Sequence, residues 1–183
     1  MIPLKLETLL AGKTVEQNRV EYKEGWNPND IIHTICAFAN DFHNVNGGYL
    51  VIGIKAEDGI PVLPPQGLPA NRLDSIQQEI FQYCNMITPR YIPRIEAVDY
   101  RNTGIFLLYL WCSAGDSGPY QAPVDVYAEK GKKKDRRMQY WIRPSSLRGV
   151  VRMPSSMALR AFLASPPAMS ARKSRASSSI RAL

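Results

Sequence analysis

The stretch that decides the fold runs from Ile35 to Ile54 and reads ICAFANDFHNVNGGYLVIGI. Its first part continues a broad apolar face that starts at Ile31, and this spacing predicts an amphipathic helix. The polar and glycine-rich residues 44–48 end that helix. Residues 49–54 are almost all apolar, which is typical of a central strand buried on both faces of a sheet. The stretch therefore predicts a helix that turns directly into a buried strand.

The turn between this helix and this strand contains three residues whose backbone properties suit it. Gly47 and Gly48 let the chain reverse sharply and let another backbone or a ligand come close. Asn40 satisfies the last helix carbonyls or adopts the left-handed conformation of a helix cap. Two interpretations stay open: the turn is a signature of helix–strand packing, or it is a loop that contacts a ligand.

Periodicity and turn residues predict further elements on both sides of this stretch. The helices are expected at residues 4–10, 27–39 and 73–84. Besides 49–54, the strands are expected at residues 19–23, 94–101, 105–111, 124–128 and 138–143. The last two strands form a hairpin with a long basic tip. About five or six strands mixed in order with two or three helices predict an α+β domain built on a mixed sheet.

The charge of the 183-residue chain is divided unevenly along the sequence. Residues 1–128 carry 9 Lys/Arg and 14 Asp/Glu, a net charge of −5. Residues 129–183 carry 14 Lys/Arg and 2 Asp/Glu, a net charge of +12. This asymmetry predicts a polyanionic partner for the basic part, and a merely solubilising tail is the alternative.

Several classes of protein are excluded by what the sequence lacks. There is no apolar run of about 18 residues for a transmembrane helix, and the N-terminus does not have the pattern of a signal peptide. Three widely spaced cysteines, two histidines and no CxxC or HExxH motif argue against a zinc site. No Walker-type phosphate-binding motif is present, so no ATP site is expected. We expect a soluble, reduced, cytoplasmic protein.

The C-terminal part differs in composition from the rest of the chain. From about Ser165 it is rich in Ser, Ala, Arg and Lys and poor in large apolar residues, so it buries too little area to offset the entropy of ordering. We predict one domain over residues 1–152 and a basic, mobile tail over residues 153–183.

Three segments together resemble the Schlafen/AlbA-2 type domain. The first is Val20-Glu-Tyr-Lys23. The second is Ile35-Cys-Ala-Phe-Ala-Asn40 followed by Gly47-Gly-Tyr-Leu-Val-Ile-Gly-Ile54. The third is Tyr140-Trp-Ile-Arg-Pro-Ser-Ser146. Their order agrees with the family over about residues 5–150. The turn formed by residues 41–46 is longer than the corresponding turn of the family. The helix that follows the third segment in the family is not recognisable beyond Arg152. A truncated or frame-altered C-terminus would explain that second difference.

The resemblance implies a nucleic-acid-binding domain of the kind found in bacterial DNA-binding regulators, and the hairpin tip fits this function. The tip, Lys130-Gly-Lys-Lys-Lys-Asp-Arg-Arg137, has six basic residues and one acidic residue. A two-stranded ribbon can enter a nucleic-acid groove and grip phosphates with its tip. The candidate phosphate contacts are Lys130, Lys132, Lys133, Lys134, Arg136, Arg137, Arg143 and Arg148.

We expect DNA rather than RNA as the ligand, with modest sequence specificity, because phosphate contacts carry no sequence information. Tyr127, Tyr140 and Trp141 interleave with the basic tip, either as stacking or as core residues. A solvated loop without a ligand is the alternative interpretation of the lysine run.

Two other functions stay open. The Schlafen nucleases of the family have paired glutamates and a later aspartate in a metal-dependent RNA-cleaving site. The resemblance maps these onto Glu16, Glu21 and, after a short slip in register, Asp58. Carboxylates of this kind suit Mg²⁺ or Mn²⁺, which would activate water. The alternative is that Glu16 and Glu21 are surface charges paired with Arg19 or Lys23. The third function is a protein-interaction module that forms a homodimer through a sheet edge.

Overall fold

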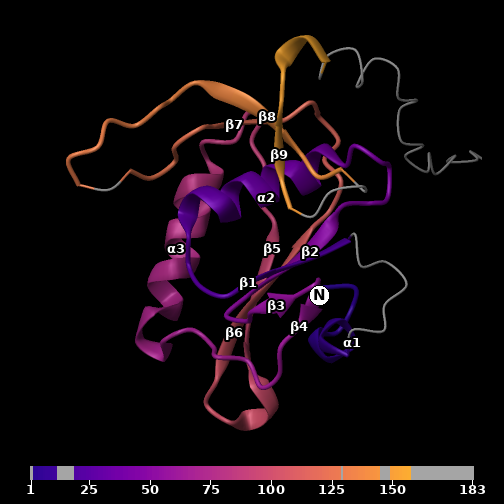
Figure 1. Ribbon diagram of the computed structural model, residues 1–183, viewed down its shortest axis with the longest axis vertical. Helices are drawn as coiled ribbons and strands as arrows, with labels where there is room; N and C mark the ends of the chain where they lie inside the picture. Colours follow the sequence, from indigo (N-terminus) through magenta and orange to yellow (C-terminus); the bar gives the residue numbers. More distant parts are fainter. Residues whose placement is uncertain (1, 12–18, 129, 145–148, 158–183) are drawn as a thin grey trace, which may run out of the picture.

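The computed structural model describes residues 2–11, 19–128, 130–144 and 149–157 (Figure 1). Its centre is a four-stranded mixed sheet with the strand order β1-β2-β6-β5. The four strands are β1 (Val20–Lys23), β2 (Gly48–Ile52), β6 (Phe106–Cys112) and β5 (Arg94–Asp99). β1 and β2 run parallel, and the other two pairs are antiparallel. The predicted α+β class and mixed sheet are thus confirmed.

Among the described residues, the helices that accompany the sheet include three α-helices and two short 3₁₀ helices. They are α1 (Leu6–Leu10), α2 (Pro28–Asn40), η2 (Ala70–Arg72), α3 (Leu73–Cys84) and η3 (Tyr100–Asn102). Helix α2 begins as the sequence predicts, because the side chain of Asn27 accepts a hydrogen bond from the backbone N–H of Asp30 and Pro28 occupies the first turn.

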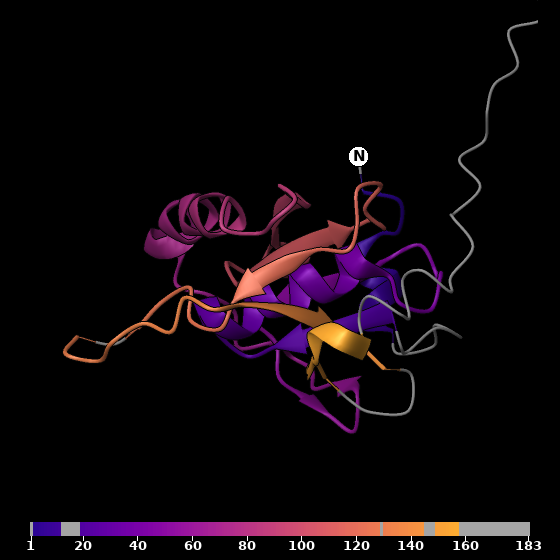
Figure 2. The same cartoon turned by 90° about the horizontal axis from the view of Figure 1, so that it is seen from above.

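A second, three-stranded antiparallel sheet lies on the other side of α2 (Figures 1 and 2). It consists of β7 (Gln121–Pro123), β8 (Met138–Ile142) and β9 (Val151–Met153). Helix α2 contacts β7 and β8 as well as β2 and β6. It is therefore enclosed between two sheets, which explains why all its residues from 31 to 40 are buried.

The hairpin differs from its prediction in one strand. β8 falls inside the predicted 138–143, but residues 124–128 are not a strand, and β7 lies just before them at Gln121–Pro123. The physical reason is that Val126 is fully buried, while the N–H groups of Val126 and Tyr127 bond to the side chain of Asn29 rather than to a neighbouring strand. A short hairpin of β3 (Ala56–Glu57) and β4 (Ile60–Pro61) completes the strands of the described residues.

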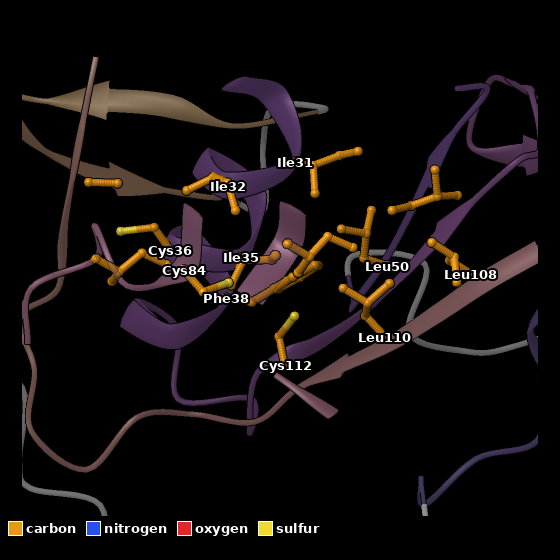
Figure 3. Close-up of a cluster of buried hydrophobic side chains, with 14 of the residues drawn as sticks. Ile31, Ile32, Ile35, Cys36, Phe38, Leu50, Cys84, Leu108, Leu110 and Cys112 are labelled. Carbon is orange, nitrogen blue, oxygen red and sulfur yellow. The ribbon is translucent and has the colours of Figure 1, made fainter. Parts of the chain in front are cut away.

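The core occupies both faces of the four-stranded sheet. Between the sheet and helices α2 and α3, apolar side chains such as Ile35, Leu50 and Leu110 form the larger cluster (Figure 3). Val51 and Leu107 point to the opposite face, where they join Leu9 and Leu10 of α1. Every residue of β2 is buried, which confirms the prediction of a central strand covered on both faces.

The three cysteines, Cys36, Cys84 and Cys112, are free thiols within the larger cluster (Figure 3). Burial raises the pKa of each of them, to about 12 for Cys84. Such thiols behave as small apolar side chains.

β9 reaches Met153, whose side chain is buried against Ile142, so the folded part extends at least to this residue. Most of the predicted tail, residues 158–183, lies outside the described residues, and the tail stays a prediction. Among the helices that the structure describes, none has the length and hydrophobicity needed to cross a bilayer.

Candidate nucleic-acid interface

The segment that connects β7 to β8, residues 124–137, leaves the body of the protein as a long projection, which we call the basic arm (Figures 1 and 2). Its two sides stay paired near the root. The N–H of Val124 donates to the carbonyl of Arg137 (3.0 Å), and that of Asp125 donates to the carbonyl of Asp135 (2.8 Å). The Asp135 N–H in turn donates to the Asp125 carboxylate (2.8 Å). These bonds hold the arm as a two-sided ribbon beyond the end of the β7–β8 ladder.

Asn29 of α2 anchors the arm to the body. Its Oδ1 accepts hydrogen bonds from the N–H groups of Val126 (2.9 Å) and Tyr127 (3.0 Å), and its Nδ2 donates to the Tyr127 carbonyl (3.0 Å). Val126 is completely buried beneath these bonds. From the sequence, Asn29 is, like Asn27, only a candidate for the cap of this helix. Its position in the first turn of a predicted helix favours a cap, and nothing local indicates a partner 97 or 98 residues away.

The basic residues of the arm differ in their surroundings. Lys134 is partly buried and its Nζ donates to the carbonyl of Val126 (3.1 Å). Arg137 is exposed but binds both carboxylate oxygens of Asp135, and this pairing lowers the pKa of Asp135 to about 2. The remaining described cations of the arm are exposed: Lys130, Lys132, Lys133 and Arg136.

Arg143 lies away from the arm. Its guanidinium donates to the carboxylate of Glu21 and to the backbone carbonyl of Val20 (3.2 Å), and it lies 5.5 Å from the centre of the Phe38 ring. The side chains of Arg143 and Glu21 are only 13% and 14% exposed. The structure therefore joins the first and third family segments by a largely buried ion pair. The other predicted contact beyond the ribbon, Arg148, lies outside the described residues.

Of the three carboxylates predicted for a nuclease site, two can be located. Glu21 is held by Arg143 and by Lys23, whose Nζ lies 3.2 Å from its Oε1. Asp58 is exposed and occupies the turn of the β3–β4 hairpin with a φ of 53°. Glu16 lies outside the described residues, and within the described ones no group of three His, Cys, Asp or Glu side chains is arranged to hold a metal ion. The nuclease site stays a prediction.

Gly47 and Gly48 have a steric role in this structure. Gly47 has a φ of 76°, and a Cβ atom at this position would lie 2.0 Å from the carbonyl oxygen of Cys112. At Gly48 a Cβ atom would lie 2.1 Å from the ring of Phe38. Any side chain would thus push helix α2 or strand β6 away from β2.

Asn40 joins three segments of the chain. Its Nδ2 donates to the carbonyls of Tyr120 (2.9 Å) and Trp141 (2.8 Å), while its Oδ1 accepts from the N–H of Tyr120 (2.6 Å). The side chain is 7% exposed. Of the two roles expected for Asn40, the left-handed cap belongs to Asp41 instead, with a φ of 39°. Asp41 also orders the turn by accepting the N–H groups of Val45 and Asn46 (both 2.9 Å).

The aromatic residues around the arm separate into packed and exposed ones. Trp141 stacks on His33 at 3.5 Å between ring centres, and its Nε1 donates to the Ala122 carbonyl (3.2 Å). His33 donates from Nε2 to the Pro123 carbonyl (3.0 Å), and burial lowers its pKa. Both rings therefore stabilise the packing of the second sheet against α2. Within the described part of the arm, Tyr127 is the aromatic residue that is exposed to solvent, at 45%.

Comparisons with known proteins show what this chain is similar to. The family model described as "Schlafen, AlbA_2" matches residues 16–145. Among solved structures, the N-terminal domain of a RecG-related protein from Nitrosomonas europaea is similar, with 22% identity and a TM-score of 0.46, over 71% of this chain and 95% of that one. The DIP2311 protein from Corynebacterium diphtheriae is similar at 19% identity and a TM-score of 0.53.

The second likeness shows the fold; it covers 87% of this chain but only 27% of the Corynebacterium chain. No curated protein matches. The family match spans well over half of the sequence and contains all three segments on which the resemblance was based, apart from the last serine of the third. The chain belongs to the Schlafen/AlbA_2 family.

Proposed function

We propose that this chain binds DNA through phosphate contacts of the basic arm, and that it acts as a transcriptional regulator, the function that the resemblance implies for bacterial relatives. One observation carries the proposal: four exposed cations are gathered on a projecting ribbon that is anchored at its root. Lysine and arginine side chains that neutralise phosphates release condensed counterions, and this release supplies most of the non-specific affinity for DNA.

The construction of the arm supports this function. A solvated loop needs no fixed root, whereas Asn29 and the buried Val126 fix the direction in which the arm leaves the body. A two-stranded ribbon fits a major groove about 12 Å wide. Lys134 and Arg137 stabilise the ribbon by bonding within it. These two residues maintain its shape, while Lys130, Lys132, Lys133 and Arg136 contact the ligand. Phosphate contacts of this kind favour modest sequence specificity.

Two variants that remove the same charge test the proposal. The arm variant replaces Lys130, Lys132 and Lys133 by glutamine. The control variant replaces three exposed basic residues outside the arm by glutamine, namely Lys5, Arg90 and Arg101. Because both variants lose three positive charges, any difference between them reports position and not net charge.

Binding is measured by fluorescence polarisation of a labelled DNA duplex at several salt concentrations. We expect the arm variant to bind at least tenfold more weakly than the wild type at low salt. Its plot of log K against log salt should be flatter by about 3, since each phosphate contact contributes about 0.9. The control should stay close to the wild type. Equal affinities and equal salt slopes for the two variants would refute the proposal.

A further inference from the structure

An open cleft of about 480 Å³ lies where the basic arm meets the start of α2. The arm contributes Asp125, Tyr127, Lys132 and Lys133 to it, and the entry of the helix contributes residues 26–29. The volume falls in the range of about 300–1,000 Å³ that is typical of small-ligand sites. We propose that this cleft holds an unpaired nucleobase, so that the protein binds nucleic acid with unpaired nucleotides more tightly than a fully paired duplex. This inference rests on the proposed function, because the nucleic-acid strand that carries the unpaired base must also contact the basic arm.

The walls of the cleft are fixed before any ligand arrives. The Asn29 side chain uses its oxygen and its nitrogen to hold the backbone of residues 126 and 127. Trp26 donates from Nε1 to the Glu79 carboxylate (2.9 Å). The carboxylate of Asp125 accepts the N–H of Asp135 (2.8 Å). A ligand therefore enters a site whose groups need little further ordering, which lowers the entropic cost of binding.

The chemistry of the cleft fits a base better than a phosphate group. Asp125 repels an anion but can accept hydrogen bonds from the amino groups of bases. The helix end offers little to an anion: Pro28 has no N–H, the Asp30 N–H bonds to the Asn27 side chain, and the Ile31 N–H bonds to the Asn27 carbonyl (3.0 Å). A phosphate is instead expected at the rim, where Lys132 and Lys133 are exposed.

Tyr127 supplies the surface on which a base can stack. It lies in the cleft and is 45% exposed although its backbone is fixed at both N–H and C=O. Stacking on an exposed aromatic ring is the common way in which proteins hold unpaired bases, and it tolerates any base sequence. A base within a continuous duplex is stacked between its neighbours and does not present a free face to this ring.

The test compares the full chain with the variants Tyr127→Leu and Tyr127→Phe. Phe81→Leu is the matched control, because Phe81 is similarly exposed, at 47%, but does not line the cleft. The probes are a single-stranded DNA that contains 2-aminopurine and the duplex of the same sequence. Affinity comes from polarisation, and quenching of 2-aminopurine reports stacking. Thermal unfolding confirms that each variant is folded.

We expect the wild type to prefer the single strand and to quench 2-aminopurine. Tyr127→Leu should lose about tenfold or more in affinity for the single strand together with the quenching, and should bind the duplex within about twofold of the wild type. Tyr127→Phe and Phe81→Leu should behave like the wild type. Unchanged single-strand binding and quenching in Tyr127→Leu would overturn the inference, and so would an equal loss on single strand and duplex.

The arm variant separates this outcome from a failure of the proposed function. If the arm variant weakens both probes while Tyr127→Leu weakens neither, the inference fails and the proposed function stands. If the arm variant binds both probes like its charge-matched control, the proposed function fails. A wild type that binds neither probe at low salt overturns both.

Discussion

Replacing Asn40 by alanine is expected to destabilise the protein more than any exposed polar substitution. The side chain is almost completely buried, and it connects the end of α2 to the backbone of Tyr120 and of Trp141. Alanine removes three hydrogen bonds and leaves one N–H group and two carbonyl groups without this partner. Each remains in a site that water does not easily reach, so the cost exceeds that of three solvent-exposed hydrogen bonds.

The magnitude follows from these contacts. A net contribution of about 1 kcal/mol for each hydrogen bond, with an added penalty for the unpaired backbone groups, gives a loss of about 3–5 kcal/mol in the free energy of unfolding. For a chain of this size, that corresponds to a decrease of about 6–20 °C in Tm. Asn40→Asp should be at least as damaging at neutral pH. Its carboxylate can still accept from the Tyr120 N–H but faces two carbonyl oxygens to which it cannot donate.

Urea unfolding followed by circular dichroism measures both variants, with Asn71→Ala as the control because Asn71 is exposed. Lowering the pH should partly restore Asn40→Asp relative to Asn40→Ala, since a protonated carboxyl group can donate one of the missing bonds. If the free energy of unfolding of Asn40→Ala lies within about 1 kcal/mol of that of the control, the reasoning is refuted, because the loss of three buried hydrogen bonds should cost more.

Two other contacts give testable predictions. Glu21→Gln should lower the free energy of unfolding by about 1–3 kcal/mol, because it removes the largely buried ion pair between Glu21 and Arg143. A double-mutant cycle with Arg143→Gln should give a coupling of about 1 kcal/mol. A coupling near zero would show that the two charges act independently. Burial lowers the pKa of His33 below its ordinary value of 6.5, so the unfolded state takes up the proton first as the pH falls. The contribution of neutral His33 to the free energy of unfolding is therefore fully present above about pH 7. It is lost as the pH drops through 6.5 towards the folded-state pKa. Between pH 7.5 and 5, the wild type should lose more stability in urea titrations than His33→Phe, which keeps a ring against Trp141, and parallel pH dependences would contradict this assignment.

The local patterns of the sequence were sufficient for the main elements of the fold. The apolar face from Ile31 onward and the apolar run after Gly48 predict helix α2 and strand β2 close to their observed bounds, because a helix buried by its side chains and a doubly covered strand each leave a periodic signal. The same residues support the family resemblance, which the family match confirms. The basic tip is equally visible, since six cations within eight residues need no partner to be recognised.

What the patterns could not supply is which distant groups would meet. Residues 124–128 alternate like a strand, but the bonds from Asn29 and the burial of Val126 replace a strand partner there. From the sequence, Arg19 or Lys23 was as good a partner for Glu21 as any residue. The structure adds Arg143, 122 residues further on. Such pairings depend on the relative positions of whole elements, which sequence spacing does not encode.

The sequence by itself therefore determined the α+β class, the family and the concentration of positive charge, since each of these depends on residues that are neighbours along the chain. The tertiary structure alone decided the roles of the individual side chains. It made Asn40 a connector between segments, paired Arg143 with Glu21, and placed Tyr127 at a cleft beside Lys132 and Lys133. The physical reason is that hydrogen bonds and ion pairs act over a few ångströms in space, and only the folded chain determines which groups come within that distance.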